Sequence, residues 1–192
     1  MSEGGTQSYE REEDVPDLVR AAVQEAQLLG FPLCCRPEHG RLLQVLARGT
    51  EGAIGEIGTG TGVGSAWMAS SGTTARIVTI ELDEERAEAA RAVLGPRATV
   101  LTGDGAELQA HGPFDLLVID GGGFGGKRGE TPLDPRAWVK PGGTFTIDDF
   151  TPADPWPPSD PGRDLWLRHP DVIATEIKLA PDLSTIVCRL PA

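Results

Sequence analysis

Residues 53–82 read AIGEIGTGTGVGSAWMASSGTTARIVTIEL, and the order of patterns in this stretch decides the fold. The run AIGEI is apolar and short, as in a buried strand, and a glycine-rich turn follows it directly. The small residues of GSAWMASS then predict a helix, and RIVTIEL predicts a second strand. The order strand, turn, helix, strand indicates two parallel strands joined by a helical crossover.

The same alternation continues along the chain. We predict helices at residues 16–30, 36–49, 64–71, 83–95 and 133–139, and strands at residues 53–57, 76–82, 98–103, 114–120, 142–149, 171–180 and 183–190. The last two strands are joined by too few residues for a helical crossover, so they must pair antiparallel. The sequence therefore predicts an α/β fold, Rossmann-like and doubly wound, with a mostly parallel sheet and a C-terminal antiparallel hairpin.

Composition and charge narrow the class of protein. At 192 residues, with 39% hydrophobic and 24% charged residues, the chain suits one globular domain. Its net charge of -12 disfavours nucleic acids and anionic membrane surfaces as partners. No apolar run approaches the ~20 residues that cross a bilayer, and the start MSEGGTQSYEREED does not resemble a signal peptide. We therefore expect a cytoplasmic protein.

The domain organisation is expected to be simple. Residues 1–14 are polar and contain glycine, so we predict a disordered N-terminal segment. Residues 15–192 then form a single domain, of which residues 15–50 are the helical N-terminal part. Residues 151–164, TPADPWPPSDPGRD, are rich in proline and predict a stiff loop, because too little chain follows for a second core.

The cysteines and histidines give no clear site. Cys34 and Cys35 are adjacent and Cys188 is far away, so the pattern suggests no disulfide framework. With His39 the first two could be imagined as a metal cluster, but the spacing fits no standard zinc pattern, and buried thiols are expected instead. His111 and His169 could each serve as a base, although solvated turn positions suit them better.

The glycine turn after the first strand is the first candidate binding site, because open α/β sheets bind ligands at the carboxyl ends of their strands. The dinucleotide pattern G-x-G-x-x-G fails in every register of this turn, which disfavours an NAD(P)-dependent oxidoreductase. The turn instead contains Glu56 followed by Gly58, Gly60 and Gly62. Glycines at this spacing let the backbone turn sharply and approach a ligand closely.

Acidic residues stand at or near the ends of three consecutive predicted strands. Glu56 suits a ligand that carries an ammonium group, and Glu81, at the end of the second strand, can accept hydrogen bonds from both ribose hydroxyls. Asp104 and Gly105, after the third strand, can reach an adenine edge. Amine, ribose and adenine together describe S-adenosylmethionine. The alternative is that these acids are simply solvated at strand ends, and NAD enzymes also carry an acid after the second strand.

With these motifs the sequence resembles the class I methyltransferases, and within them the catechol O-methyltransferase-like group. The resemblance runs from about residue 37 to 190 through EIGTGTG, VTIELDEERAEAAR, GDG, FDLLVID and KPGGTFTIDD. It implies a seven-stranded sheet whose last strand is inserted antiparallel, and transfer of a methyl group by in-line displacement to a small acceptor, most often a hydroxyl oxygen. It also implies a homodimer. The family usually has serine in the glycine turn; here Gly64 takes that place and Ser65, counted with the cofactor-binding residues, follows.

A second glycine-rich stretch, VIDGGGFGGKRGET at residues 118–131, matches the start of the P-loop pattern. A P-loop needs a serine or threonine after its lysine to hold Mg²⁺, and Arg128 stands there instead. Pro132 and Pro135 also interrupt the helix that should follow. We therefore interpret the stretch as a lid over the acceptor site.

The resemblance assigns catalytic and metal roles near this stretch. It places a divalent metal, which would be Mg²⁺, at Asp120 and at Asp148 and Asp149, and it also brings Asp120 to the cofactor. The family's lysine base falls on Gly123, so Lys127 is the nearby replacement, and Asp120 and Lys127 are the catalytic candidates. The alternatives are acids that only cap strand ends, a solvated lysine, an amine acceptor that needs no base, or a cofactor-binding protein without catalysis.

Overall fold

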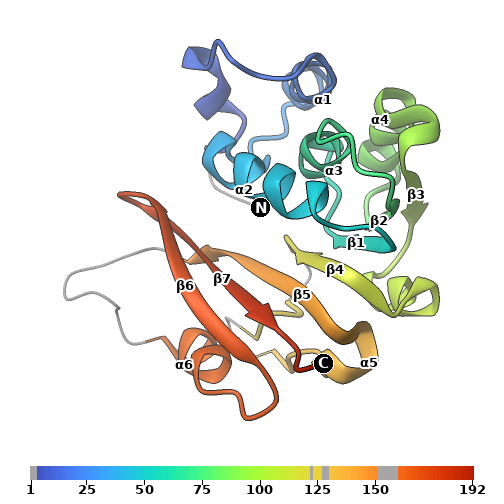
Figure 1. Cartoon of the computed structure of the whole chain (residues 1–192). Coiled ribbons are helices and arrows are strands. Elements are labelled where there is room, and N and C mark those ends of the chain that lie inside the picture. The colour runs from blue at the N-terminus through green and yellow to red at the C-terminus, as the bar shows by residue number, and fades with distance from the viewer. Residues whose placement is uncertain (1–3, 122, 127–129, 151–159) are drawn as a thin grey trace.

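The computed structural model describes residues 4–121, 123–126, 130–150 and 160–192, apart from the side chain of residue 149. A seven-stranded sheet runs through the molecule in the order β3-β2-β1-β4-β5-β7-β6 (Figure 1). Its strands are β1 (Ala53–Ile57), β2 (Arg76–Glu81), β3 (Thr99–Thr102), β4 (Phe114–Ile119), β5 (Val139–Phe150), β6 (Ile173–Ala180) and β7 (Leu183–Arg189).

The pairing of the strands confirms the predicted fold class. β1 lies between β2 and β4 and is parallel to both, with Ile54 opposite Ile77 on one side and Leu116 on the other. β7 pairs antiparallel with β5 and with β6, so the last strand is inserted into the sheet as expected. The chain leaves β1 toward β2 on one side and returns to β4 on the other, which opens a crevice at the carboxyl ends of β1 and β4.

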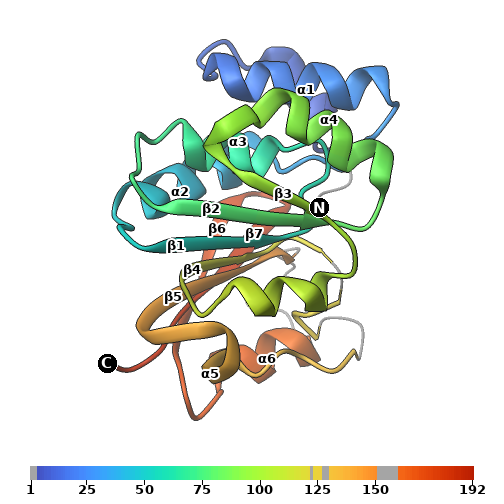
Figure 2. The ribbon, with the colours of Figure 1, turned by 90° about the vertical axis from the view of Figure 1, so that its right-hand side faces the viewer.

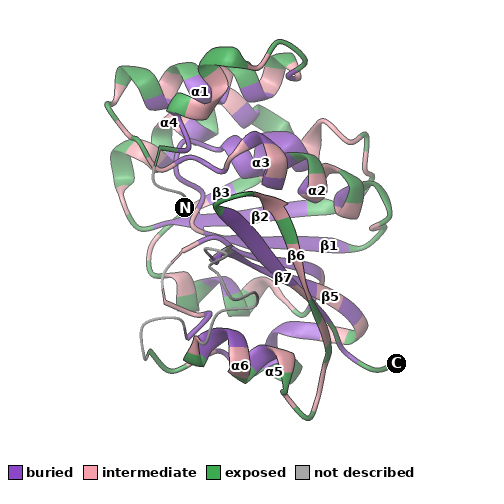
Figure 3. Cartoon of the chain, turned by 90° about the vertical axis from the view of Figure 1, so that its left-hand side faces the viewer, coloured by how far each residue is buried: buried purple, intermediate pink, exposed green. Residues whose placement is uncertain are grey.

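Helices cover both faces of the sheet. The elements are α1 (Asp17–Leu28), α2 (Pro37–Arg48), α3 (Val63–Ala69), α4 (Glu84–Leu94), α5 (Pro135–Trp138) and α6 (Pro161–Leu167), with the 3-10 helices η1 (Gln7–Arg11), η2 (Gly95–Arg97) and η3 (Gly105–His111). α1 to α4 lie on one face and α5 and α6 on the other (Figure 2). Each face has its own apolar core, and the central strands are buried while exposed residues gather on the outer helix surfaces and in the connecting turns (Figure 3).

Local sequence signals account for the helix boundaries. Asp83 caps α4, since its side chain accepts a hydrogen bond from the Arg86 N–H at 3.0 Å, and Gly95 ends the helix with φ 53°. Pro37 stands in the first turn of α2, where its missing N–H costs nothing. Both helices were expected at these places.

The prediction of a disordered start is wrong for residues 4–14, which are folded against the domain. The Thr6 hydroxyl donates to the Phe31 carbonyl at 2.6 Å. The Tyr9 hydroxyl donates to the Cys35 carbonyl at 2.8 Å and accepts from the Trp67 Nε1–H at 2.9 Å. The average polarity of the segment conceals two side chains that find buried partners far along the chain. Residues 1–3 lie outside the described ranges.

The proline-rich segment also contains an element that was not expected. Residues 151–164 were predicted to be a loop, but α6 begins at Pro161, and the Asp160 side chain caps it by accepting from the Arg163 N–H at 3.0 Å. The number of prolines conceals a standard start signal, an aspartate at the N-cap followed by proline in the first turn. Residues 151–159 are not among those that the structure describes.

The cysteines are buried as expected, and His169 stands at a turn. Cys34, Cys35 and Cys188 are buried free thiols. His169 lies at a turn, where its Nδ1 accepts from the Asp171 N–H at 3.2 Å, and its ring stacks on Trp166. Within the described ranges, none of the helices combines the length and the apolar character needed to span a membrane.

A buried ion pair fastens α6 to the antiparallel end of the sheet. Arg163 Nε lies 2.8 Å from Glu176 Oε2, and the two side chains are 2% and 5% exposed. The Ser184 hydroxyl donates to Glu176 Oε1 at 2.5 Å, and the Arg163 guanidinium lies 5.1 Å from the centre of the Phe150 ring. The pair therefore joins α6, β6, β7 and the end of β5.

Removing one partner of this pair should destabilise the fold strongly. Arg163→Met leaves the Glu176 carboxylate buried without its cation, so the free energy of unfolding in urea should fall by about 3–5 kcal/mol. Arg163→Met combined with Glu176→Leu should recover part of that loss, because no buried charge is left alone.

The matched control is Arg168→Met, which removes an arginine that is 80% exposed and pairs with Asp164 across 3.8 Å. That change should cost less than about 1 kcal/mol. A similar small loss for Arg163→Met would show that the buried pair contributes little to stability.

Candidate functional site

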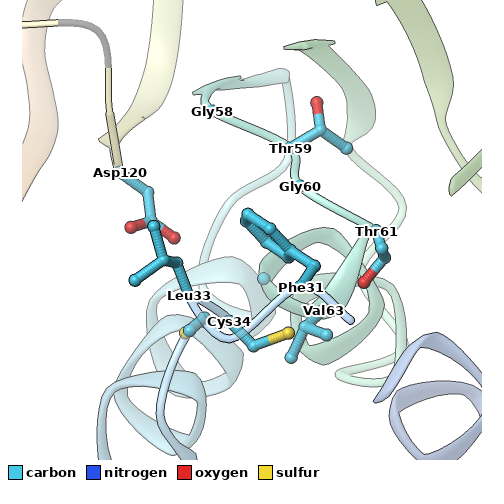
Figure 4. Close-up of a pocket in the computed structure, with 11 residues that line it drawn as sticks. Phe31, Leu33, Cys34, Gly58, Thr59, Gly60, Thr61, Val63 and Asp120 are labelled. Carbon is cyan, nitrogen blue, oxygen red and sulfur yellow. The ribbon is translucent and has the colours of Figure 1, made fainter. Parts of the chain in front are cut away.

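A hollow opens at the carboxyl ends of β1 and β4, where the strand order reverses (Figure 4). Its walls come from the connection between α1 and α2, from the glycine turn after β1 and from the end of β4. The lining residues are Phe31, Leu33, Cys34, Cys35, Gly58, Thr59, Gly60, Thr61, Val63, Gly64 and Asp120. The hollow spans about 190 Å³ of empty space, part of which is open to solvent.

The glycine turn has the backbone shape that the sequence predicts. Gly58, Gly60 and Gly62 have φ values of 92°, 55° and 93°, in the left-handed region that favours glycine. A Cβ at Gly58 would also stand 2.8 Å from the carbonyl oxygen of Asp120, which is backbone and cannot yield cheaply. The turn can therefore be built only with glycine at these positions, and it brings bare backbone to the hollow.

Glu56 lies beneath this turn rather than in the open hollow. Its side chain is fully buried, and its Oε2 accepts hydrogen bonds from the Ser65 hydroxyl at 2.5 Å and the Thr79 hydroxyl at 2.7 Å. Ser65 thus supports Glu56 instead of lining the hollow. The other oxygen, Oε1, makes no hydrogen bond with the described residues and lies 2.2 Å from where a Cβ at Gly64 would stand.

The surroundings of Glu56 shift its ionisation into the neutral range. Burial raises the pKa of this carboxyl to about 7, although the hydrogen bonds from Ser65 and Thr79 oppose the shift. The negative charges of Glu81 and Asp148 raise the pKa further. A cation near Oε1 would have the opposite effect and favour the carboxylate.

Glu81, at the end of β2, is bonded to the glycine turn. Its Oε2 accepts the Gly60 N–H at 2.8 Å. Its Oε1 accepts from the Asp83 N–H at 3.1 Å and from Arg86, whose Nε and Nη2 lie at 3.2 and 2.7 Å. The side chain is 3% exposed, so the carboxylate is held firmly at the rim of the turn.

Asp104 and Gly105 stand one strand further out and are not among the lining residues of the hollow. Asp104 is exposed and caps η3, since its side chain accepts the Ala106 N–H at 2.8 Å while its own N–H donates to Glu107 at 3.0 Å. A Cβ at Gly105 would meet the Phe124 ring at 2.6 Å. Asp104 therefore stabilises the start of η3, and its contact with the adenine stays a prediction.

The two described candidate metal ligands are both buried. Asp120 is 2% exposed and lines the hollow, whereas Asp148, 1% exposed, faces α2. Its Oδ2 lies 3.9 Å from Nδ1 of His39, which in turn lies 3.8 Å from the Cys35 sulfur. No local pattern predicts that His39 and Asp148 lie close together, because more than a hundred residues separate them in the chain.

The predicted metal site and base cannot be assembled from these residues. Across residues 4–121, 123–126, 130–150 and 160–192, no three or more His, Cys, Asp or Glu side chains are grouped so as to hold a metal ion. The side chain of Asp149 and the whole of Lys127 fall outside the described part of the chain. Both assignments stay predictions, and the described donors alone do not fit a divalent cation.

Sequence reasoning missed the wall opposite the glycine turn. Phe31 places its ring edge 3.0 Å from the Cβ position of Gly60, and the Arg86 guanidinium lies 4.9 Å from the centre of that ring. The rest of this wall is formed by Leu33, Cys34 and Cys35. The segment carries no recognisable motif, so only the packing of α1 and α2 against the turn reveals it.

The sequence of the chain is similar to that of known methyltransferases. Residues 56–150 match the family model described as a methyltransferase domain. A protein of Mycobacteroides abscessus, provisionally named an O-methyltransferase, is 36% identical over 116 residues, which cover 54% of this chain and 53% of that protein. A Mycobacterium sp. protein with the same name is 36% identical over 115 residues, or 52% of its length. The matched region thus spans about half the length of the curated relatives.

Solved structures show the same fold over nearly the whole chain. The O-methyltransferase TomG from Streptomyces achromogenes, involved in tomaymycin synthesis and solved with S-adenosylmethionine, has a TM-score of 0.72 at 20% identity, with 100% of both chains covered. The O-methyltransferase of Bacillus cereus, solved with S-adenosylhomocysteine, has a TM-score of 0.72 at 20% identity, with 96% of both chains covered. The domain match and the curated relatives agree, and residues 56–150 of the chain belong to the methyltransferase domain family.

Proposed function

We propose that the chain is a methyltransferase that uses S-adenosylmethionine and methylates a small acceptor, most often at a hydroxyl oxygen. The observation that carries this proposal is the Gly58–Gly62 turn at the end of β1, with the Glu81 carboxylate bonded to its Gly60 N–H. This turn lies inside the matched methyltransferase domain. The cofactor-bound structures of TomG and the Bacillus cereus protein support the choice of cofactor.

The chemistry of the residues in and around the hollow suits this cofactor. The bare backbone of the turn would face its methionine part, and Glu56 Oε1, which needs a hydrogen-bond donor, would receive its ammonium beside Gly64. Glu81 would take the ribose hydroxyls, as acids at this strand end do in dinucleotide-binding folds. When bound, the cofactor supplies a methyl group on a positively charged sulfur.

The reaction then needs little from the protein beyond position. The acceptor oxygen forms a bond to the methyl carbon while the carbon–sulfur bond breaks, and the hydroxyl loses its proton. The walls of the hollow hold the two reactants in line and exclude water, and such positioning can supply most of the acceleration. We assign the proton to Asp120, which lines the hollow and is 2% exposed.

Several finer features stay predictions. Mg²⁺ at Asp120, Asp148 and Asp149 is one of them, and no step of the mechanism is derived through it. A second is Lys127 as the base. Contacts of Asp104 and Gly105 with the adenine are a third. The remaining predictions are a small-molecule acceptor without nucleic-acid or membrane partners, a homodimer and a cytoplasmic location.

Cofactor binding tests the proposal most directly. In titration calorimetry the chain should bind S-adenosylhomocysteine and should not bind NAD measurably at the same concentrations. Gly60→Val should abolish that binding, because its Cβ would meet Phe31 at 3.0 Å and φ 55° is strained for valine.

Gly49→Ala is the matched control, since a Cβ there meets nothing closer than 3.7 Å and the residue lies at the end of α2. It should bind like the parent chain. Binding of NAD instead of S-adenosylhomocysteine would replace the proposal with an oxidoreductase.

Asp120 should matter for turnover more than for cofactor affinity. With S-adenosylmethionine and a panel of catechols, phenols and amines, formation of S-adenosylhomocysteine should fall about 10²-fold or more in Asp120→Asn. Its Kd for S-adenosylhomocysteine should change by less than about threefold if the group acts on the acceptor.

Asp171→Asn serves as the control, because Asp171 pairs with the exposed Arg136 on the surface. Equal losses of turnover and cofactor affinity in Asp120→Asn would assign the residue to cofactor binding instead. Methylation confined to amines would correct the proposed acceptor atom.

The ionisation of Glu56 should make cofactor affinity depend on pH. Because its pKa is raised to about 7, only half of the empty protein carries the Glu56 carboxylate at that pH, and S-adenosylhomocysteine should bind more tightly as the pH rises from about 6 to 8. Glu56→Gln should bind more weakly and lose this dependence.

The stability of the protein without ligand should change with pH in the opposite direction to the affinity. The native state keeps the Glu56 proton that the unfolded state loses near its ordinary pKa, so the free energy of unfolding should drop by about 3 kcal/mol as the pH rises from 4.5 to 7. Glu56→Gln should lack this part of the decline, whereas Glu51→Gln, an exposed acid, should keep it. Identical pH profiles in all three proteins would mean that Glu56 titrates in its ordinary range.

A further inference from the structure

The hollow is smaller than the ligand that the proposed function requires. Small-molecule sites usually enclose about 300–1,000 Å³, whereas this hollow spans about 190 Å³ even when the solvent at its open mouth is included. The Phe31 ring, in the middle of Figure 4, causes much of this shortage, because its edge lies directly against Gly60. A cofactor seated on the bare backbone of the turn would meet this ring.

Both carboxylate oxygens of Glu81 already accept hydrogen bonds within the protein. Oε2 holds the Gly60 N–H, while Oε1 receives both Nε and Nη2 of Arg86. The Arg86 guanidinium at the same time lies 4.9 Å from the centre of the Phe31 ring, a cation–π distance. Ring, guanidinium and carboxylate therefore form one connected group across the mouth of the turn.

The backbone of Phe31 is held in place from both sides. Its N–H donates to the Ala26 carbonyl at 2.8 Å, and its carbonyl accepts from the Thr6 hydroxyl at 2.6 Å. Gly30 before it has φ 63°, a conformation that a glycine adopts at no cost. The ring is thus presented to the turn by a defined local structure rather than by a loose loop.

We infer that Phe31 and Arg86 form a latch that closes the cofactor site, and that Arg86 and the cofactor's ribose compete for Glu81. This inference rests on the proposed function for the identity of the ligand. Opening requires the Arg86 guanidinium to leave Glu81 and the Phe31 ring to leave Gly60. The latch lowers affinity for the cofactor and for the adenosylhomocysteine product alike, which makes Arg86 a positioning residue for product release.

Arg86→Met tests the competition, because it keeps the length of the side chain and removes the donors. In calorimetry its Kd for S-adenosylhomocysteine should be about tenfold lower than that of the parent chain, as expected when a charged hydrogen bond no longer has to be broken. Phe31→Ala should bind faster in stopped-flow measurements. Arg97→Met, an exposed arginine just after α4, gives the same change of net charge and should behave like the parent chain.

A measurement without ligand separates the latch from the proposed function. In hydrogen exchange, the amides of residues 58–62 should exchange faster in Arg86→Met and Phe31→Ala than in the parent chain and in Arg97→Met. Faster exchange together with tighter binding supports the latch. Unchanged exchange, or weaker binding in Arg86→Met, overturns it and makes Arg86 a cofactor contact. If the parent chain binds no S-adenosylhomocysteine, the proposed function fails, and faster exchange would still support a closed site for another ligand.

Discussion

The structure depends on one close approach of backbone to backbone, where the turn after β1 passes the end of β4. A Cβ at Gly58 would stand 2.8 Å from the Asp120 carbonyl oxygen, and the Asp120 N–H donates to the Ile57 carbonyl at 2.9 Å. This contact joins the two central strands at the point where the strand order reverses. It also fixes the distance between the glycine turn and Asp120, the two parts of the hollow that were expected to act together.

The sequence predicts the sheet better than it predicts the site, for a physical reason. Strands and helices follow from local periodicity, so their order and the antiparallel hairpin at residues 173–189 were expected and are present. The glycine turn and Glu81 also follow, because they stand at consecutive strand ends. Phe31 and Arg86 could not be found in this way, since Phe31 lies between α1 and α2, Arg86 lies on α4, and only tertiary packing brings the two together at the turn. For the same reason Tyr9 escaped notice, because composition alone cannot show that its hydroxyl meets Trp67.

Charge at the carboxyl edge of the sheet suits the proposed ligand. Glu56, Glu81, Asp120 and Asp148 are all buried and stand at or near the ends of neighbouring strands. Such a group of acids is costly to bury together, and the raised pKa of Glu56 is one expression of that cost. A ligand with a sulfonium and an ammonium would offset part of this repulsion, and the Arg86 guanidinium, 2.7 Å from Glu81 Oε1, offsets another part. The same four buried acids thus lower the stability of the fold and favour a positively charged ligand.

The glycine turn departs from the family's usual pattern at Gly64, and the position of Glu56 explains this difference. Where the family usually has serine, Gly64 leaves room for Glu56 Oε1, and a Cβ there would stand 2.2 Å from that oxygen. The serine one residue later, Ser65, turns inward and donates to the other oxygen of Glu56. Moving the hydroxyl by one position rotates it by about 100° around α3, from the hollow to the core. The exchange gives up a hydroxyl that could touch a ligand and secures the carboxylate beneath it, so under the proposed function a buried acid, rather than a hydroxyl of the turn, would meet the cationic ligand.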